Sequence, residues 1–299
     1  MGLSIEQLLP KSLNEELKNT LLDLELRAAS ATDADAVDFM ENIASQNEAA
    51  AIREVLARVE AAFVTSINEH ESKSNPDACI ITGVPGSGKS FLSHDLVENT
   101  GHVYICGDEI KKSFIREIKN HSLLAKNARL TDAIFLHRLT SPINWCLYDY
   151  AVWHHKDIVV EMIGSDSKLD AQMIFALAKT HKVSLFHVAT RIENSIENAI
   201  SRYFDPANAD YGRYISLVDI AENHSKIIKA FNETVWTLAL NGLDCQVTVF
   251  DNSERRMVSI FDAKIARNSL PDLSDFTRAV RQMDDRFKDS RTEAPDCSL

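Results

Sequence analysis

The chain has 299 residues, of which 25% are charged and 45% hydrophobic, and this length allows one large domain or one domain with an extension. Its 44 acidic residues outnumber 32 basic residues and leave a formal charge of −12. That surplus argues against broad binding to nucleic acids or anionic membranes, although a local basic pocket would still suit phosphates. No apolar run reaches the roughly 18 residues that a membrane-spanning helix needs. We therefore expect neither a nucleic acid nor a membrane as a partner.

The amino terminus and the cysteines indicate a reducing compartment. The first residues do not form a signal peptide, and Glu6 stands where a myristoylation site requires Ser or Thr. The cysteines are odd in number, and several lie in apolar, strand-like runs; they are Cys79, Cys106, Cys146, Cys245 and Cys297. This usage is typical of buried thiols, not of a disulfide or metal framework. We expect a soluble, globular, cytoplasmic protein.

Residues 1–74 show helical patterns and are predicted to form a helical extension. Ser12-Leu-Asn-Glu15 matches a capping box, and leucines follow it at helical spacing. A second segment begins near Thr32, and a third carries one apolar stripe from Ile52 to Ile67. The polar segment Glu71–Pro76 breaks the pattern and predicts a linker.

From residue 77 onward, short β-rich runs alternate with helical patterns. The predicted strands are Ala78–Thr82, Val103–Cys106, Asp157–Val160, Val183–Ala189 and Cys245–Phe250. Ser141-Pro142 predicts a helix start, and Ser216–Asn241 predicts a long helix that ends at Gly242. Such alternation predicts an α/β fold with a parallel sheet flanked by helices. We place this domain at residues 75–265, followed by a C-terminal helix and flexible tail at 266–299.

A glycine-rich loop carries the strongest chemical signal in the chain. Gly83-Val-Pro-Gly-Ser-Gly-Lys89-Ser90 fits the P-loop pattern G-x-x-x-x-G-K-[ST], between an apolar strand and a helical pattern. Lys89 is expected to reach the β- and γ-phosphates, and Ser90 to ligate Mg²⁺. The predicted nucleotide site therefore comprises Gly83, Val84, Pro85, Gly86, Ser87, Gly88, Lys89, Ser90 and Phe91. This predicts a P-loop NTPase-type sheet but does not define the reaction.

Other motifs narrow the class of P-loop protein. The Asp-x-x-Gly and Asn-Lys-x-Asp motifs that a GTPase needs do not occur in the chain. An AAA-type motor requires an acidic pair at the end of an apolar strand, whereas Ile158-Val-Val-Glu161 offers one acid followed by Met162. A small-molecule kinase remains, and such an enzyme needs an acid near the acceptor hydroxyl and arginines on the phosphoryl group.

Two acids stand where predicted parallel strands end. Asp108 follows the second strand, beside the P-loop, and is a candidate catalytic base for an acceptor hydroxyl. The alternative is that Asp108 caps the next helix. Glu161 closes the third strand and is a candidate for substrate hydroxyls or, through water, for Mg²⁺. Its alternative is a solvated acid at a strand end.

Two arginines lie at and beyond the end of a predicted helix. Arg202 ends the helical stretch Ile192–Tyr203, and Arg213 lies in the loop that follows. That loop is rich in Gly, Pro, Asn and Asp and is bordered by helices, an arrangement typical of a lid over bound phosphates. Arginine suits this role because its planar guanidinium binds phosphate in a bidentate manner. An arginine of this kind, taken alone, more often forms a surface ion pair.

In this arrangement the chain resembles the zeta toxin family of P-loop kinases over roughly residues 78–252. The matching elements are the P-loop, Ile105-Cys-Gly-Asp108-Glu-Ile-Lys111, a strand ending in Glu161, Ser201-Arg202-Tyr203, and Tyr211-Gly-Arg213. The resemblance implies phosphorylation of a nucleotide-activated sugar, notably UDP-N-acetylglucosamine at its 3′-hydroxyl, with ATP or GTP and Mg²⁺. It also implies Lys89, Asp108, Arg202 and Arg213 as catalytic residues, Asp108 and Glu161 as substrate-binding residues and Ser90 as the metal ligand.

Two other functions stay open at this point. One is a P-loop kinase for another hydroxyl, such as an antibiotic, a nucleoside or a nucleic-acid end, the last disfavoured by the acidic charge. The other is a nucleotide-sensing regulatory module, disfavoured because a sensor needs no acceptor-side base. The resemblance further implies a helical antitoxin as a partner, or intramolecular inhibition by residues 1–74. Those helices are expected to pack on the kinase, either as a restraint or as part of its core.

Overall fold

The computed structural model describes residues 5–30, 46–127, 130, 133–205, 214–266 and 278. Its centre is a six-stranded sheet in the order β2-β3-β1-β4-β5-β6. The first five strands are mutually parallel, and β6 pairs antiparallel with β5 at one edge. The strands are β1 (Asp77–Thr82), β2 (Val103–Ile105), β3 (Ile158–Glu161), β4 (Lys182–Ala189), β5 (Cys245–Asp251) and β6 (Val258–Ile265). The predicted parallel α/β fold is confirmed.

Edge strand β6 is absent from the sequence prediction, and the predicted strand ends move by a residue. In β6, most side chains are exposed or half-buried, so the segment lacks the apolar run of a central strand. Segment β6 forms a strand because it pairs with β5, and an edge strand needs only one partner. Cys106, predicted to end the second strand, is instead the cap of the next helix, and Asp157 lies just before β3.

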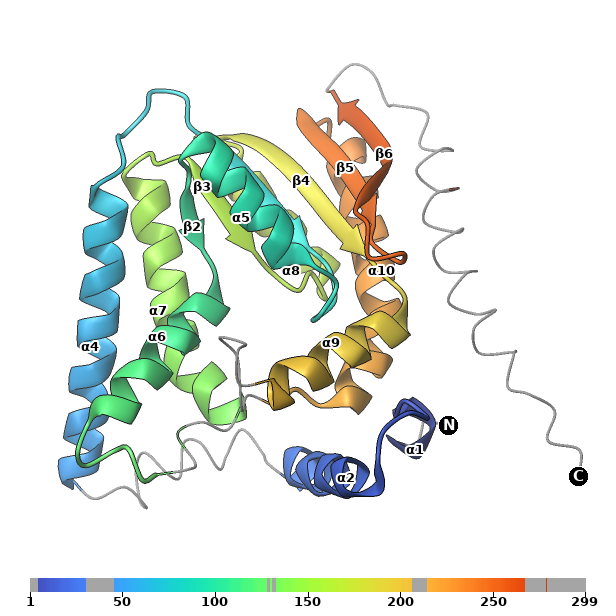
Figure 1. Ribbon diagram of the computed structural model, residues 1–299. Helices are drawn as coiled ribbons and strands as arrows, with labels where there is room; N and C mark the ends of the chain where they lie inside the picture. Colours follow the sequence, from blue (N-terminus) through green and yellow to red (C-terminus); the bar gives the residue numbers. More distant parts are fainter. Residues whose placement is uncertain are drawn as a thin grey trace, which may run out of the picture.

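Helices cover both faces of the sheet (Figure 1). Ile80 of β1 faces a core shared with α4, α6, α7, α8 and α10, whereas its neighbour Ile81 faces α5. Successive strand residues point to opposite faces, so these two cores lie on the two sides of the sheet. The helices are α4 (Gln46–Asn68), α5 (Lys89–Thr100), α6 (Gly107–Asn120), α7 (Ala133–Trp153), α8 (Ser167–Leu177), α9 (Ile192–Phe204) and α10 (Leu217–Leu240).

The predicted helix start at Ser141-Pro142 is wrong, because Pro142 lies inside α7. Proline lacks the amide that bonds to the preceding turn and normally costs a helix about 3 kcal/mol. One apolar stripe nevertheless runs through both halves of the helix and is buried in the main core; it includes Leu136, Ile143, Leu147 and Ala151. Burial of this stripe against α4 and α6 outweighs the local preference for a helix start.

The helical extension packs on the rest of the chain at two places. The short helix α1 (Ile5–Leu8) and α2 (Glu15–Ser30) lie beside α9 and α10, where Leu21 is fully buried (Figure 1). Helix α4 instead packs against α6 and α7. The expected packing is therefore observed, while the proposed domain boundaries stay a prediction. Asn14, not Ser12, caps α2, because its Oδ1 accepts the Leu17 amide at 2.8 Å.

Several predictions lie outside the described residues: the helix near Thr32, Arg213 and the C-terminal helix and tail, apart from Arg278. Helix α10 begins at Leu217, is capped by Ser216 and ends just before Gly242, as expected. Within the described ranges the cysteines are free thiols; Cys106 and Cys245 are buried, but Cys146 is exposed, contrary to expectation. None of the helices in these ranges has the length and apolarity needed to cross a membrane.

Candidate active site

The P-loop connects β1 to α5 and has the backbone conformation that its glycines permit. Gly86 and Gly88 have φ angles of 80° and 100°, a region that side chains with a Cβ rarely adopt. A Cβ on Gly86 would also lie 2.7 Å from the carbonyl oxygen of Ser195 in α9. These positions therefore require glycine for both conformation and space.

Two asparagines from distant parts of the chain hold the loop from outside. Asn198 of α9 donates its Nδ2 to the Gly86 carbonyl at 2.8 Å. Asn252, which follows β5, donates to the Ser87 carbonyl at 2.9 Å. These hydrogen bonds engage carbonyls of the loop, whereas a loop of this kind binds phosphate through its amides. The sequence analysis missed both residues, and the only local signal was the position of Asn252 just beyond a parallel strand.

Lys89 begins α5 and points back into its own loop. Its Nζ donates to the carbonyls of Gly83 and Val84 at 2.7 and 2.8 Å. Burial lowers the pKa of Lys89 and the positive charge of Arg202 acts in the same direction, while Glu161 and Asp108 oppose the shift. The ammonium thus lies within the electrostatic reach of the other predicted site residues. A bound phosphate would supply the anionic partner that these neutral carbonyls only partly replace.

Ser90 and Glu161 come together beside Lys89. The Ser90 hydroxyl lies 3.4 Å from Glu161 Oε2, and the Tyr104 hydroxyl donates to the other carboxylate oxygen. Burial raises the pKa of Tyr104, with the charge and hydrogen bond of Glu161 adding to it, so the phenol remains a donor. A hydroxyl and a carboxylate are hard oxygen ligands of the kind that Mg²⁺ takes. These residues therefore fit a magnesium ion, and Tyr104 was missed because a strand tyrosine indicates packing.

Asp108 lies in the first turn of α6, at the carboxyl end of β2. Lys111 forms an ion pair with its Oδ1 at 3.1 Å, and the Asp108 side chain is 34% exposed. The alternative that Asp108 caps the helix is wrong, because Cys106 occupies the cap position without a side-chain hydrogen bond. The Asp108 carboxylate remains accessible to an incoming hydroxyl.

Of the remaining predicted site residues, the structure describes Arg202 and Phe91 but not Arg213. Arg202 lies near the end of α9, where its charge acts on Lys89. Phe91 is 72% exposed in the first turn of α5, beside the P-loop. Arg213 lies outside the described residues. The structure therefore brings five predicted residues together at the carboxyl ends of the parallel strands: Lys89, Ser90, Asp108, Glu161 and Arg202.

Two buried titratable groups near the carboxyl ends of the strands were not identified from the sequence. His187 of β4 stacks on Phe231 and shares a hydrogen bond of 2.9 Å with Thr82, and burial lowers the pKa of His187 to about 3. Asp170 of α8 is 7% exposed, and burial, with the charge of Asp166, raises its pKa to about 6. Perturbed groups of this kind cluster at functional sites. Neither has a motif that could have identified it.

Comparison with known proteins connects this geometry to a family. A family model described as zeta toxin matches residues 45–264. No curated protein sequence matches the chain. The fold is similar to the AvrRxo1-ORF1:-ORF2 complex, with a TM-score of 0.54, 14% identity and 88% of each chain covered. In the same complex with ATP the TM-score is 0.53, with 14% identity over 77% of this chain and 71% of that chain.

A further solved structure belongs to the PezAT chromosomal toxin–antitoxin system of Streptococcus pneumoniae. It shows 15% identity and a TM-score of 0.49, and the match covers 79% of this chain and 95% of that chain. At these identities the comparisons with solved structures concern the fold. The family match, which spans most of the chain, includes the P-loop and all the described site residues.

Proposed function

Because the chain belongs to the zeta toxin family of P-loop kinases, we propose that it transfers the γ-phosphoryl group of ATP or GTP to a hydroxyl of a nucleotide-activated sugar such as UDP-N-acetylglucosamine. The observation that carries this proposal is the meeting of Lys89, Asp108, Glu161 and Arg202 at the carboxyl ends of the parallel strands. A nucleotide-sensing module needs Lys89 to bind phosphate, but it does not need an acceptor-side carboxylate. The arrangement therefore favours transfer over sensing.

Each residue has a distinct proposed role in the transfer. Lys89 and the P-loop amides bind the phosphates, and Arg202, together with Arg213, neutralises charge on the moving phosphoryl group. Asp108 accepts the proton of the acceptor hydroxyl as that oxygen bonds to the γ-phosphorus and the bond from the γ-phosphorus to the β–γ bridging oxygen breaks. Ser90 and Glu161 would hold Mg²⁺, which would supply positive charge to neutralise the phosphates of the nucleotide. Glu161 is thereby proposed for the metal as well as the sugar.

The proposed partners follow from the family and from the packing of the extension. AvrRxo1-ORF1 is solved in complex with a second protein, ORF2. We propose that this chain is controlled by a helical antitoxin, or by its own helices α1 and α2. Helices α1 and α2 lie beside α9, which carries Arg202, and this position supports control by the chain's own helices.

Transfer of label from γ-labelled ATP or GTP to a panel of acceptors tests the proposal. The panel contains UDP-N-acetylglucosamine, other nucleotide sugars, nucleosides, an aminoglycoside and a DNA end. We expect label in a nucleotide sugar, absent with Lys89→Ala. Label in another acceptor would select the alternative kinase, and nucleotide binding without transfer to any acceptor would favour the sensing module.

A further inference from the structure

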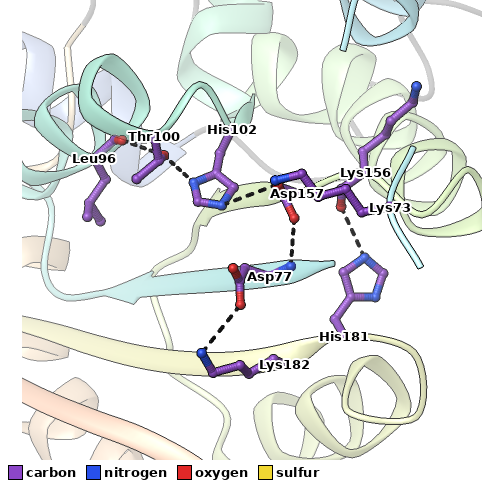
Figure 2. A network of polar contacts seen from close by, with 9 residues as sticks. All are labelled: Lys73, Asp77, Leu96, Thr100, His102, Lys156, Asp157, His181 and Lys182. Atoms are coloured by element: carbon purple, nitrogen blue, oxygen red, sulfur yellow. Dashed lines mark hydrogen bonds and ion pairs between the residues drawn. The ribbon is translucent and has the colours of Figure 1, made fainter. Parts of the chain in front are cut away.

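A cluster of metal-ligating side chains lies where the parallel strands begin. The P-loop lies at the other end of these strands, where they finish. Asp77 begins β1, His102 immediately precedes β2, and Asp157 immediately precedes β3 (Figure 2). One ligand atom of each lies within 4.8 Å of the other two. His102 and Asp157 are each 7% exposed. The three residues come from different segments, and the strand pairing β2-β3-β1 holds those segments together.

The hydrogen bonds around His102 determine which ring nitrogen is available. The Thr100 hydroxyl donates to the Leu96 carbonyl at 2.6 Å, so its oxygen accepts from His102 Nδ1 (Figure 2). With the proton on Nδ1, the lone pair of the neutral ring lies on Nε2. That atom faces Asp157 Oδ2 at 3.8 Å, which is too far for a hydrogen bond. A buried lone pair thus faces a carboxylate oxygen, an arrangement that a cation between them would stabilise.

Cationic side chains already approach this cluster from solvent. The ammonium of Lys73 contacts Asp157 Oδ2, and the ammonium of Lys182 lies 3.8 Å from Asp77 Oδ1. Their side chains are 53% and 73% exposed, and Lys73 lies on the linker before β1. The other oxygen of Asp157 accepts the Asp77 amide at 2.7 Å, which fixes the orientation of the carboxylate. Lys73 therefore stands where a metal would bind and can swing away.

We propose that Asp77, His102 and Asp157 form a binding site for a divalent transition-metal ion of the zinc type, with Lys73 as a competing cation. Imidazole nitrogen with carboxylate oxygen suits zinc, whereas Mg²⁺ prefers oxygen alone. With bond lengths of about 2.0–2.2 Å, two ligand atoms of a tetrahedral ion lie about 3.3–3.6 Å apart. The gap of 3.8 Å is close to this separation, and the limit of 4.8 Å needs a side-chain movement of about 1 Å.

The contacts behind the proposed ligands resemble the outer shell of known metal sites. A ligating histidine usually donates its other N–H to an oxygen, as His102 does to Thr100. Asp157 is oriented by the Asp77 amide. An ion here would tie together the starts of β1, β2 and β3, so its role would be structural. It would act independently of the kinase site at the other end of the strands.

Titration of Zn²⁺ into the chelator-treated full-length protein tests the proposal, with Co²⁺ as an optical probe of tetrahedral geometry. We expect a saturable rise in melting temperature and a cobalt d–d absorption band, both lost in His102→Gln and in Asp77→Asn. Lys73→Ala should tighten binding, and Thr100→Val should weaken it by about 10-fold. Mg²⁺ should have no such effect in the absence of nucleotide.

The matched control is His181→Gln, which changes a neighbouring buried histidine. Both its ring nitrogens already have partners, Nδ1 at the Thr180 hydroxyl and Nε2 at the Lys156 carbonyl. This variant should therefore bind Zn²⁺ as the parent does. Equal Zn²⁺ affinity in the parent and in both His102→Gln and Asp77→Asn would overturn the proposal, as would unchanged affinity in Lys73→Ala. The cluster would then be an ion-pair network that anchors the linker.

Discussion

Glu25 of α2 accepts a hydrogen bond from the Leu217 amide at 3.0 Å, so a side chain of the helical extension caps the first turn of α10. Tyr214 and Ser216 donate to the same carboxylate, which is 8% exposed. A buried anion at a helix amino terminus is stabilised by the unpaired amides and by the helix dipole. The extension is thereby attached to the segment that directly follows Arg213.

Glu25→Ala should lower the free energy of unfolding by about 2 kcal/mol, because it leaves buried amide and hydroxyl donors without an acceptor. Urea unfolding followed by circular dichroism measures the change. Glu25→Gln, which keeps one acceptor oxygen, should lie between the parent and Glu25→Ala. Glu15→Ala is a surface control, since the Glu15 side chain, which pairs with Lys18, is 82% exposed. An unchanged midpoint in Glu25→Ala would show that this contact does not hold α2.

Removal of residues 1–45 should lower the melting temperature and promote aggregation, because the apolar cluster around Leu21 loses its cover. Helix α2 packs there against Ile192, Ile196 and Ile200 of α9. Phosphoryl transfer is measured on the same preparation. If the truncated protein stays folded and transfers phosphate faster, the extension restrains the kinase and is not part of its core.

Lys89→Ala should reduce phosphoryl transfer by about 10²–10³-fold or more and weaken ATP binding, since the cation that contacts the phosphates is removed. Equilibrium binding of ATP and single-turnover transfer measure the two effects. Lys179→Ala, an exposed lysine at the end of α8, is the control and should keep full activity. Near-parental turnover in Lys89→Ala would mean that this loop is not the nucleotide site.

Asp108→Asn should reduce turnover by about 10²–10⁴-fold while the melting temperature stays the same, because the amide cannot accept the proton. The cap position is Cys106, so the helix loses no side-chain cap. Glu109→Gln, which alters the adjacent carboxylate in its pair with Lys112, is the matched control and should remain active. A drop in stability with activity retained would instead assign Asp108 a structural role.

His187→Asn should make stability less sensitive to acid. Burial lowers the pKa of His187 to about 3, so the folded state keeps it neutral while the unfolded state binds a proton below about 6.5. Its contribution is fully present above pH 6.5 and is lost as the pH falls toward 3, up to about 5 kcal/mol. The asparagine keeps a donor toward Thr82 but has no such titration.

Urea unfolding at pH 7.5, 6 and 5 measures this slope. The parent should lose more stability than His187→Asn over the same range, even if the variant starts lower through loss of the stack on Phe231. Identical slopes in the parent and His187→Asn would contradict the assignment.

The P-loop conformation, the parallel strands and the ends of α10 depend on a few neighbouring residues and were predicted correctly, whereas the helix starts expected at Ser12 and Ser141 were wrong. The P-loop is contiguous, and its glycines meet a local steric demand, so its motif predicts the conformation that the structure shows. The parallel strands follow from short β-branched runs, because a strand covered on both faces must be apolar throughout. Ser216 and Gly242 bound α10 as expected, since capping is also local. The sequence by itself therefore determined the fold class and the conformation of the P-loop.

Features that depend on distant contacts were decided only by the tertiary structure. Asn198 and Asn252 reach the P-loop across 112 and 165 residues of sequence. Pro142 stays within a helix because the stripe around it is buried, and β6 exists because β5 offers an edge. The meeting of Glu161 with Ser90, of Glu25 with Leu217 and of His102 with Asp157 has the same origin. A polar side chain has many local partners of similar energy, and packing of the whole chain selects among them.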